Sequence, residues 1–168
     1  SKLRDRLTKL TQFWPGPLSV ILPKRASIPD TVTAGLSTVA VRIPRHPVAL
    51  ALLEEADRPI AAPSANPFAY VSPTCAEHVA RILDERVELI LNGGACEVGL
   101  ESTVISISSE PVRVLRPGGV ALEALRELFP DIILESRKQS SNQPFEAPGM
   151  SLKHYSPKTP VVLRNGTE

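Results

Sequence analysis

The sequence has few aromatic residues, only two cysteines and no long apolar run. One Trp, two Tyr and four Phe in 168 residues offer little for base stacking, which disfavours an RNA-binding module. Cys75 and Cys96 form no CxxC pair and have no adjacent His, which argues against a disulfide framework, a zinc site or a redox motif. The longest apolar stretch, residues 48–53, is far shorter than the roughly 18 residues that a membrane-spanning helix needs. We therefore predict a cytoplasmic protein without a membrane partner.

Positive and negative charges nearly balance. The chain has 19 Lys and Arg against 18 Asp and Glu, a formal net charge of +1, which does not indicate a strongly basic nucleic-acid or membrane binder. The first ten residues contain neither the apolar core of a signal peptide nor an initiator Met. We expect the numbering to begin inside a longer gene product.

Proline is abundant, with 17 residues where average usage is roughly 5%. This predicts many short elements separated by rigid turns. Apolar spacing predicts helices at 3–10, 47–55, 76–83 and 121–128, and strands at 18–22, 38–43, 60–62, 88–91, 103–107 and 112–115. The fold class is therefore α/β (α+β), a twisted mixed parallel and antiparallel sheet with packed helices.

The composition changes near residue 135. We predict one domain over residues 1–135, because elements alternate throughout it. Residues 136–160 are polar and rich in proline, which indicates an interdomain linker. Residues 161–168 are expected to begin a further domain that this chain does not contain.

The strand expected at 38–43 carries the first candidate site. Alternation places Thr38, Ala40 and Arg42 on one face of this strand. A guanidinium beside a hydroxyl suits an anionic ligand, because its donors match a carboxylate or a phosphate. An edge-strand arginine that points into water would give the same pattern. His46 follows at the strand-to-helix turn, where it either joins this ligand face or packs a loop.

The second candidate is a polar loop bounded by prolines. Ser64 and Asn66 follow the strand expected at 60–62 and can project to the same side. A hydroxyl and an amide held this rigidly suit ligand recognition, although the local sequence by itself favours a self-satisfied Ser or Asx turn.

The third candidate is the end of the hairpin expected at 103–115. If Ile107 faces Val112, then Thr103 faces Arg116 and Ser102 converges with them. No nucleophile–base pair, catalytic carboxylate pair or metal-ligand spacing is visible. An enzyme with this sequence would work by positioning and charge neutralisation.

Five segments in order resemble the YrdC-type threonylcarbamoyl-AMP synthases. The segments are FWPGPL at 13–18, VRIP with His46-Pro47 at 41–47, APSAN at 62–66, GLESTV at 99–104 and LRPG at 115–118. The segments at 148–150 and 153–157 also resemble the linker of the long form, which joins the synthase domain to a C-terminal domain. The N-terminal part of the family, with its Lys-x-Arg motif, has no counterpart in this sequence.

The resemblance implies a nucleotidyltransferase that makes L-threonylcarbamoyladenylate and pyrophosphate from ATP, L-threonine and bicarbonate. Mg²⁺ would accompany the nucleotide, and the product would supply the transferase machinery that modifies adenosine 37 of tRNA. The resemblance places Arg42, His46, Ala62 and Ser102 on threonine, and Thr38, Ser64, Asn66, Ser72, Arg116 and Tyr155 on ATP. The alternatives are an RNA-binding module and the carbamoyl-adenylate-forming domain of a hydrogenase maturation carbamoyltransferase. Weak direct RNA binding is compatible with the synthase interpretation as well.

Overall fold

The computed structural model describes residues 1–67 and 70–135. Its helices are α1 (Lys2–Leu10), α2 (Asp30–Thr33), α3 (Pro47–Ala56), α4 (Ala76–Leu83) and α5 (Leu122–Leu128), with short 3-10 turns at Thr11–Phe13 and Asp84–Arg86. Its strands are β1 (Leu18–Pro23), β2 (Thr38–Val41), β3 (Thr103–Ser106), β4 (Arg113–Arg116) and β5 (Ile133–Leu134).

The described strands form one mixed sheet in the order β2-β1-β3-β4-β5. Strand β1 pairs with β2 antiparallel and with β3 parallel. Strands β3 and β4 form the predicted antiparallel hairpin, and β5 adds to β4 in parallel. The mixed sheet with packed helices confirms the fold class predicted from the sequence.

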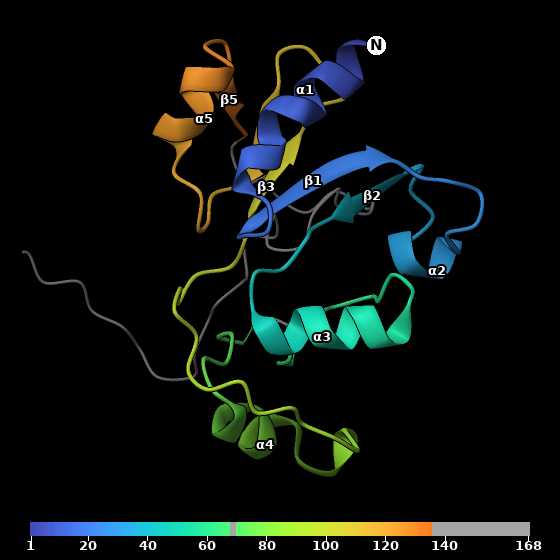
Figure 1. The fold of residues 1–168 in the computed structure, drawn as a ribbon, viewed down its shortest axis with the longest axis vertical. Helices are drawn as coiled ribbons and strands as arrows, with labels where there is room; N and C mark the ends of the chain where they lie inside the picture. Colours follow the sequence, from blue (N-terminus) through green and yellow to red (C-terminus); the bar gives the residue numbers. More distant parts are fainter. Residues whose placement is uncertain (68–69, 136–168) are drawn as a thin grey trace, which may run out of the picture.

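The main core lies between one face of the sheet and helices α1 and α5 (Figure 1). Leu18 and Val20 of β1 and Ile105 of β3 are completely buried there, together with Leu10 of α1 and Leu125 of α5. Apolar residues alternate along β1, so every second side chain enters this core. On the opposite face, the buried apolar cluster among the described residues consists of Ile21, Val104 and Leu115.

Two predicted strands are wrong. Residues 60–62 and 88–91 pair with no described strand, and Leu89 at the second segment is 77% exposed. The first segment is only three residues long, and Pro59 and Pro63 on either side lack the backbone N–H donors that would extend a ladder. The second segment lies along neither described edge of the sheet, and an apolar pattern alone supplies no hydrogen-bonding partner.

Helices α3 and α4 lie at the other end of the molecule from α1 and α5 (Figure 1). No described residue between 34 and 101 is fully buried. Polar contacts tie this region together, including the Cys96 N–H that donates to Thr74 O at 2.8 Å and an exposed Arg45–Glu97 ion pair. Within the described residues, no helix has the length and apolar character needed to cross a membrane.

Candidate functional site

The sheet register places the predicted ligand residues on one face. Ala40 pairs with Ile21, and Val41 pairs with Val20, so the next residue, Arg42, falls beside Ser19. Thr38 shares the face of Ala40, as alternation predicted. We call this surface the site face; it also carries Val104 and Arg116, and it is opposite the core under α1 and α5.

A bulge brings Arg116 onto the site face. Ile105 pairs with Val114, but Val104 pairs with Arg116, so Leu115 is an extra residue on β4. The predicted pairing of Thr103 with Arg116 is therefore wrong. The Thr103 side chain is buried elsewhere, where its hydroxyl contacts the backbone N–H of Val120 at 2.9 Å and the carbonyl at 2.7 Å.

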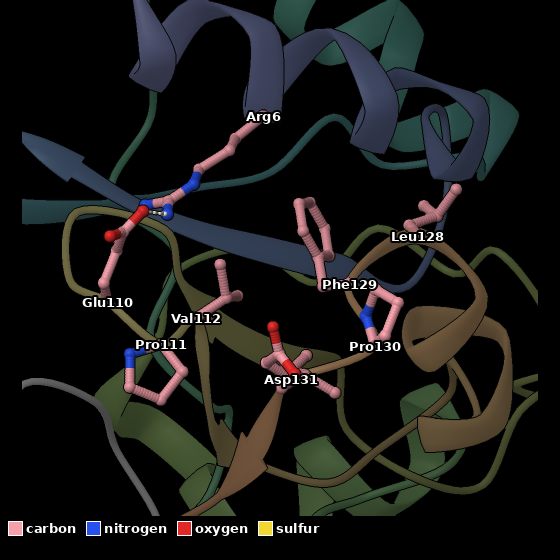
Figure 2. A pocket seen from close by; sticks show the side chains of 9 residues that line it. Arg6, Glu110, Pro111, Val112, Leu128, Phe129, Pro130 and Asp131 are labelled. Carbon is pink, nitrogen blue, oxygen red and sulfur yellow. Dashed lines mark hydrogen bonds and ion pairs between the residues drawn. The ribbon is translucent and has the colours of Figure 1, made fainter.

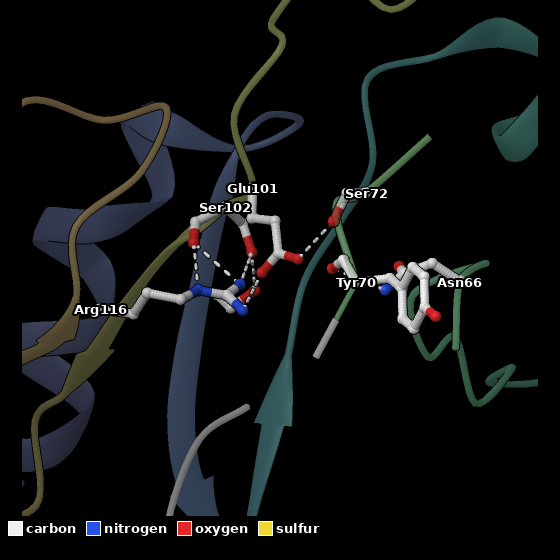
Figure 3. A network of polar contacts seen from close by, with 7 residues as sticks. Asn66, Tyr70, Ser72, Glu101, Ser102 and Arg116 are labelled. Carbon is white, nitrogen blue, oxygen red and sulfur yellow. Dashed lines mark hydrogen bonds and ion pairs between the residues drawn. The ribbon is translucent and has the colours of Figure 1, made fainter. Parts of the chain in front are cut away.

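Arg116 and Ser102 meet as predicted (Figure 3). The guanidinium donates from Nε and Nη2 to the Ser102 carbonyl, at 3.2 and 3.0 Å, and from Nη2 to Ser102 Oγ at 3.2 Å. Ser102 Oγ is also hydrogen-bonded to Ser19 Oγ at 2.8 Å. Four polar contacts therefore hold Ser102 and the guanidinium in a defined position at the end of the sheet.

Glu101 extends this network to Ser72. One carboxylate oxygen of Glu101 forms an ion pair with Arg116 Nη1, and the other accepts a hydrogen bond from Ser72 Oγ at 2.9 Å (Figure 3). The turn after β4 lies directly against this segment, because a Cβ at Gly118 would lie 2.6 Å from the backbone nitrogen of Thr103. Only glycine permits such close backbone contact.

Asn66 is held in its loop by its amide group. Its Nδ2 donates to the carbonyls of Pro67 at 3.0 Å and Tyr70 at 3.2 Å, whereas its buried Oδ1 has no hydrogen-bond partner among the described residues. The unpaired acceptor can take a donor from a ligand or a water. Ser64 and Ala62 are exposed, and Ser64 makes no hydrogen bond to another described residue.

His46 has a clear structural task. Its Nδ1 accepts a hydrogen bond from the Val48 N–H at 3.3 Å and caps α3, while Nε2 donates to Gly93 O at 3.1 Å. A Cβ at Gly93 would lie 2.5 Å from the His46 ring, so the ring packs directly on this glycine. The loop-packing alternative therefore describes its present contacts, and contact with threonine stays a prediction.

The remaining predicted residues are not brought into the network. Thr38 is half-buried and Arg42 is exposed, and neither side chain forms a hydrogen bond or an ion pair with another described residue. Tyr155 lies outside the described residues. Cys75 occupies the N-cap position of α4, and the Thr74 hydroxyl before it lies 3.3 Å from His78 Nδ1.

Two residues of the network had been given no role from the sequence. Glu101 belongs to the GLESTV segment, but no spacing rule pointed to its partner Ser72, 29 residues away. Ser19 offered a clearer signal, because it is a polar residue inside an otherwise apolar strand. No group of three metal-ligating side chains gathers among the residues that the structure describes.

A cavity of about 360 Å³ lies on the other face, between α1 and the segment after α5 (Figure 2). It is lined by Val112, Phe129 and Ile132 of the main core and by Arg6. Arg6 donates to the carbonyls of Ile107 and Ser109 and pairs with Glu110, so its charge is used to attach α1 to the hairpin turn. None of the predicted site residues lines this cavity.

Comparison with known families relates the chain to one of them. The Sua5/YciO/YrdC family model, described as "Telomere recombination", matches residues 2–118. The chain belongs to this family. A second family model, for the C-terminal domain of threonylcarbamoyl-AMP synthase, matches residues 120–168. Helix α5 and strand β5 fall within this second match, although both pack on the sheet built by the first.

Relatives named threonylcarbamoyl-AMP synthase are found in archaea and bacteria. The Pyrococcus abyssi protein is 44% identical over 156 residues, which is 92% of this chain and 46% of that protein. The Bacillus subtilis protein is 44% identical over 161 residues, 95% of this chain and 46% of that protein. The chain thus spans about half the length of these members of the Sua5/YciO/YrdC family.

Solved structures of the family share the fold. Pyrococcus abyssi Sua5 in complex with L-threonine superposes with a TM-score of 0.86 at 43% identity, covering 92% of this chain and 46% of that one. A variant of the same protein, with a histidine and the following tyrosine replaced by alanine, gives a TM-score of 0.82 over 90% of this chain and 44% of that one, again at 43% identity. Escherichia coli YciO superposes with a TM-score of 0.61 at 26% identity, over 73% of this chain and 59% of that one.

Proposed function

We propose that this chain is part of a threonylcarbamoyl-AMP synthase. In the proposed reaction, the amine of L-threonine and bicarbonate form a carbamate and release water. A carbamate oxygen then attacks the α-phosphorus of ATP, which forms threonylcarbamoyladenylate and releases pyrophosphate. The observation that carries the proposal is the partly buried Arg116–Ser102–Glu101 network on the site face, in a chain 44% identical to two named synthases.

The site face suits this chemistry because it offers two guanidinium groups, of which that of Arg116 is held in place, and neutral polar groups. We assign Arg42, His46, Ala62 and Ser102 to threonine, with the Arg42 guanidinium on the carboxylate. We assign Thr38, Ser64, Asn66, Ser72, Arg116 and Tyr155 to the nucleotide. Since the amide donors of Asn66 are already used, its free Oδ1 would accept from an O–H or N–H of the nucleotide, and the Ser64 hydroxyl is the available donor for a phosphate oxygen.

Mg²⁺ would enter with the nucleotide. The described residues present no three-residue group that could hold a metal ion, and Mg²⁺ in nucleotide sites is commonly held by phosphate oxygens with few protein ligands. The contribution of the described residues is therefore to bind and orient the two substrates. The entropy cost of bringing three reactants together is then met when the substrates bind, and the chemical step no longer includes it.

The wider assignment follows from the same proposal. The product would be used in the cytoplasm by a transferase that modifies adenosine 37 of tRNA. The domain boundaries, with a synthase domain at 1–135, a linker at 136–160 and the start of another domain at 161–168, are part of the proposal. The synthase name of the relatives favours this function over the hydrogenase-maturation and RNA-binding alternatives.

The test uses the full-length protein with ATP, Mg²⁺, L-threonine and ¹³C-bicarbonate. We expect mass spectrometry to detect threonylcarbamoyladenylate that contains one ¹³C, with an equal amount of pyrophosphate. Leaving out threonine should abolish both products. Pyrophosphate release that does not depend on threonine, or the absence of the labelled adenylate, would contradict the proposal.

A further inference from the structure

Glu101 lies where three parts of the site meet. It precedes β3, contacts Ser72 from the loop before α4, and pairs with Arg116 at the end of β4. Its side chain is 19% exposed and that of Arg116 is 12% exposed. An ion pair removed from water to this extent is expensive to break, because each charge would be left without compensation.

The two carboxylate oxygens of Glu101 have different tasks. The oxygen toward Arg116 fixes the Nη1 side of the guanidinium, while Nε and Nη2 are fixed by Ser102. The guanidinium group is therefore held at two of its edges. The oxygen toward Ser72 accepts the hydroxyl proton, which sets the rotamer of Ser72 and attaches its loop to the sheet.

We infer that Glu101 is a positioning residue for the nucleotide subsite. This inference rests on the proposed function, which assigns Ser72 and Arg116 to ATP. Glu101 holds these two side chains in one arrangement and itself contacts no substrate. Ser102, assigned to threonine, contacts Arg116 but has a second hydrogen bond to the Ser19 hydroxyl, so loss of Glu101 should disturb Ser102 less than Ser72 and Arg116 and affect the two substrates unequally.

The test compares Glu101→Ala with Glu101→Gln in the full-length protein by steady-state pyrophosphate release. We expect Glu101→Ala to raise the KM for ATP about tenfold or more, the scale for a lost hydrogen bond to a charged group, and the KM for threonine less than about threefold. Glutamine can turn its carbonyl oxygen toward Arg116 and its amide toward the Ser72 hydroxyl, which then accepts. Because Glu101→Gln keeps both hydrogen bonds but not the charge, we expect it to recover part of the ATP affinity.

The matched control is Glu97→Ala. Glu97 belongs to the same exposed loop, and its carboxylate pairs only with Arg45 among the described residues, at the surface. We expect wild-type kinetics for this variant. If Glu101→Ala behaves like Glu97→Ala, or if it raises both KM values equally, the positioning role is wrong.

Two further measurements keep the outcomes separate. Should Glu101→Ala fail to fold, Glu101→Asp replaces it. A side chain one methylene shorter keeps the charge but cannot reach both partners, so an unchanged KM for ATP in this variant would overturn the inference.

If the wild-type protein makes no adenylate, the proposed function fails. Calorimetric titration with ATP alone then tests Glu101, and equal affinities of wild-type and Glu101→Ala would reject its role.

Discussion

Arg42 is the exposed cation at the β2 end of the site face, and it forms no ion pair with another described residue. If it binds the threonine carboxylate, Arg42→Ala should weaken threonine binding by about 1.5–3 kcal/mol, the range for hydrogen bonds to charged groups. Titration calorimetry on the full-length protein measures this change. Arg45→Ala is the control, because Arg45 is also exposed but is directed to Glu97. Equal threonine affinities for the two variants would remove Arg42 from the site.

Substitutions at Ser64 and Asn66 distinguish a role in ligand binding from a role in the stability of the loop. Ser64 is exposed and makes no hydrogen bond to another described residue, so Ser64→Ala should leave the melting temperature unchanged and lower threonine-dependent pyrophosphate release. Asn66→Ala removes two hydrogen bonds within the loop and should cost about 1–2 kcal/mol of stability as well. The Ser64→Ala and Asn66→Ala double variant should release no pyrophosphate yet remain folded at 25 °C. Full activity in Ser64→Ala would assign this segment to a structural turn alone.

At the scale of elements, the contact between Gly93 and His46 joins the 92–94 loop to the start of α3. Gly93→Ala would push the His46 ring away, breaking its bond to Gly93 O and weakening the cap on Val48. We expect a loss of about 0.5–2 kcal/mol, the range for a helix N-cap. Urea unfolding measures it. Gly99→Ala serves as the control, since a Cβ at Gly99 would meet no atom within 4 Å, and an equal loss in both variants would refute the explanation.

The start of α4 should respond to acid through Glu77. The pKa of its carboxyl lies below the ordinary value of 4.5, first because it accepts a hydrogen bond from its own backbone N–H, and also through the Cys75 thiol and the nearby His78. A lowered folded-state pKa gives stability that is present above pH 4.5 and is lost as the pH falls through the folded pKa. Stability curves between pH 3 and 7 should therefore differ in shape between wild type and Glu77→Gln. Parallel curves would show that Glu77 has no such role.

The elements that could be predicted from the sequence are those with a local periodic signal. Helix α3 followed from Pro47 and its apolar spacing, and the β3–β4 hairpin followed from two apolar runs around a turn. The bulge at Leu115 has no such signal, because it depends on how two strands pair. The contact of Glu101 with Ser72 likewise depends on the tertiary fold. The contact of Ser102 with Arg116 was predicted correctly although the register was wrong by one residue, because Ser102 precedes the start of β3 and Arg116 ends the neighbouring strand β4.

For the whole molecule, buried apolar contacts are concentrated between the sheet and helices α1 and α5. The described residues between 34 and 101 contribute no fully buried side chain, so their amides should exchange through openings that cost less free energy than global unfolding. Hydrogen exchange should show fast exchange in α3 and α4 and slow exchange in β1 and β3. Binding of ATP and threonine should slow exchange around 64–72 most strongly. Uniform protection across the described residues would contradict this division.

The bulge at Leu115 has a consequence for changes in chain length. Leu115 is the extra residue between Val114 and Arg116. The side of the sheet that Arg116 occupies therefore depends on how many residues separate it from Val114. An insertion in the turn at 108–111 would lengthen the turn and leave Arg116 in place. One more residue after Val114 would turn the guanidinium toward the core under α1 and α5. Insertions and deletions during the divergence of this family should therefore accumulate in the turn and be rare in the last three residues of β4.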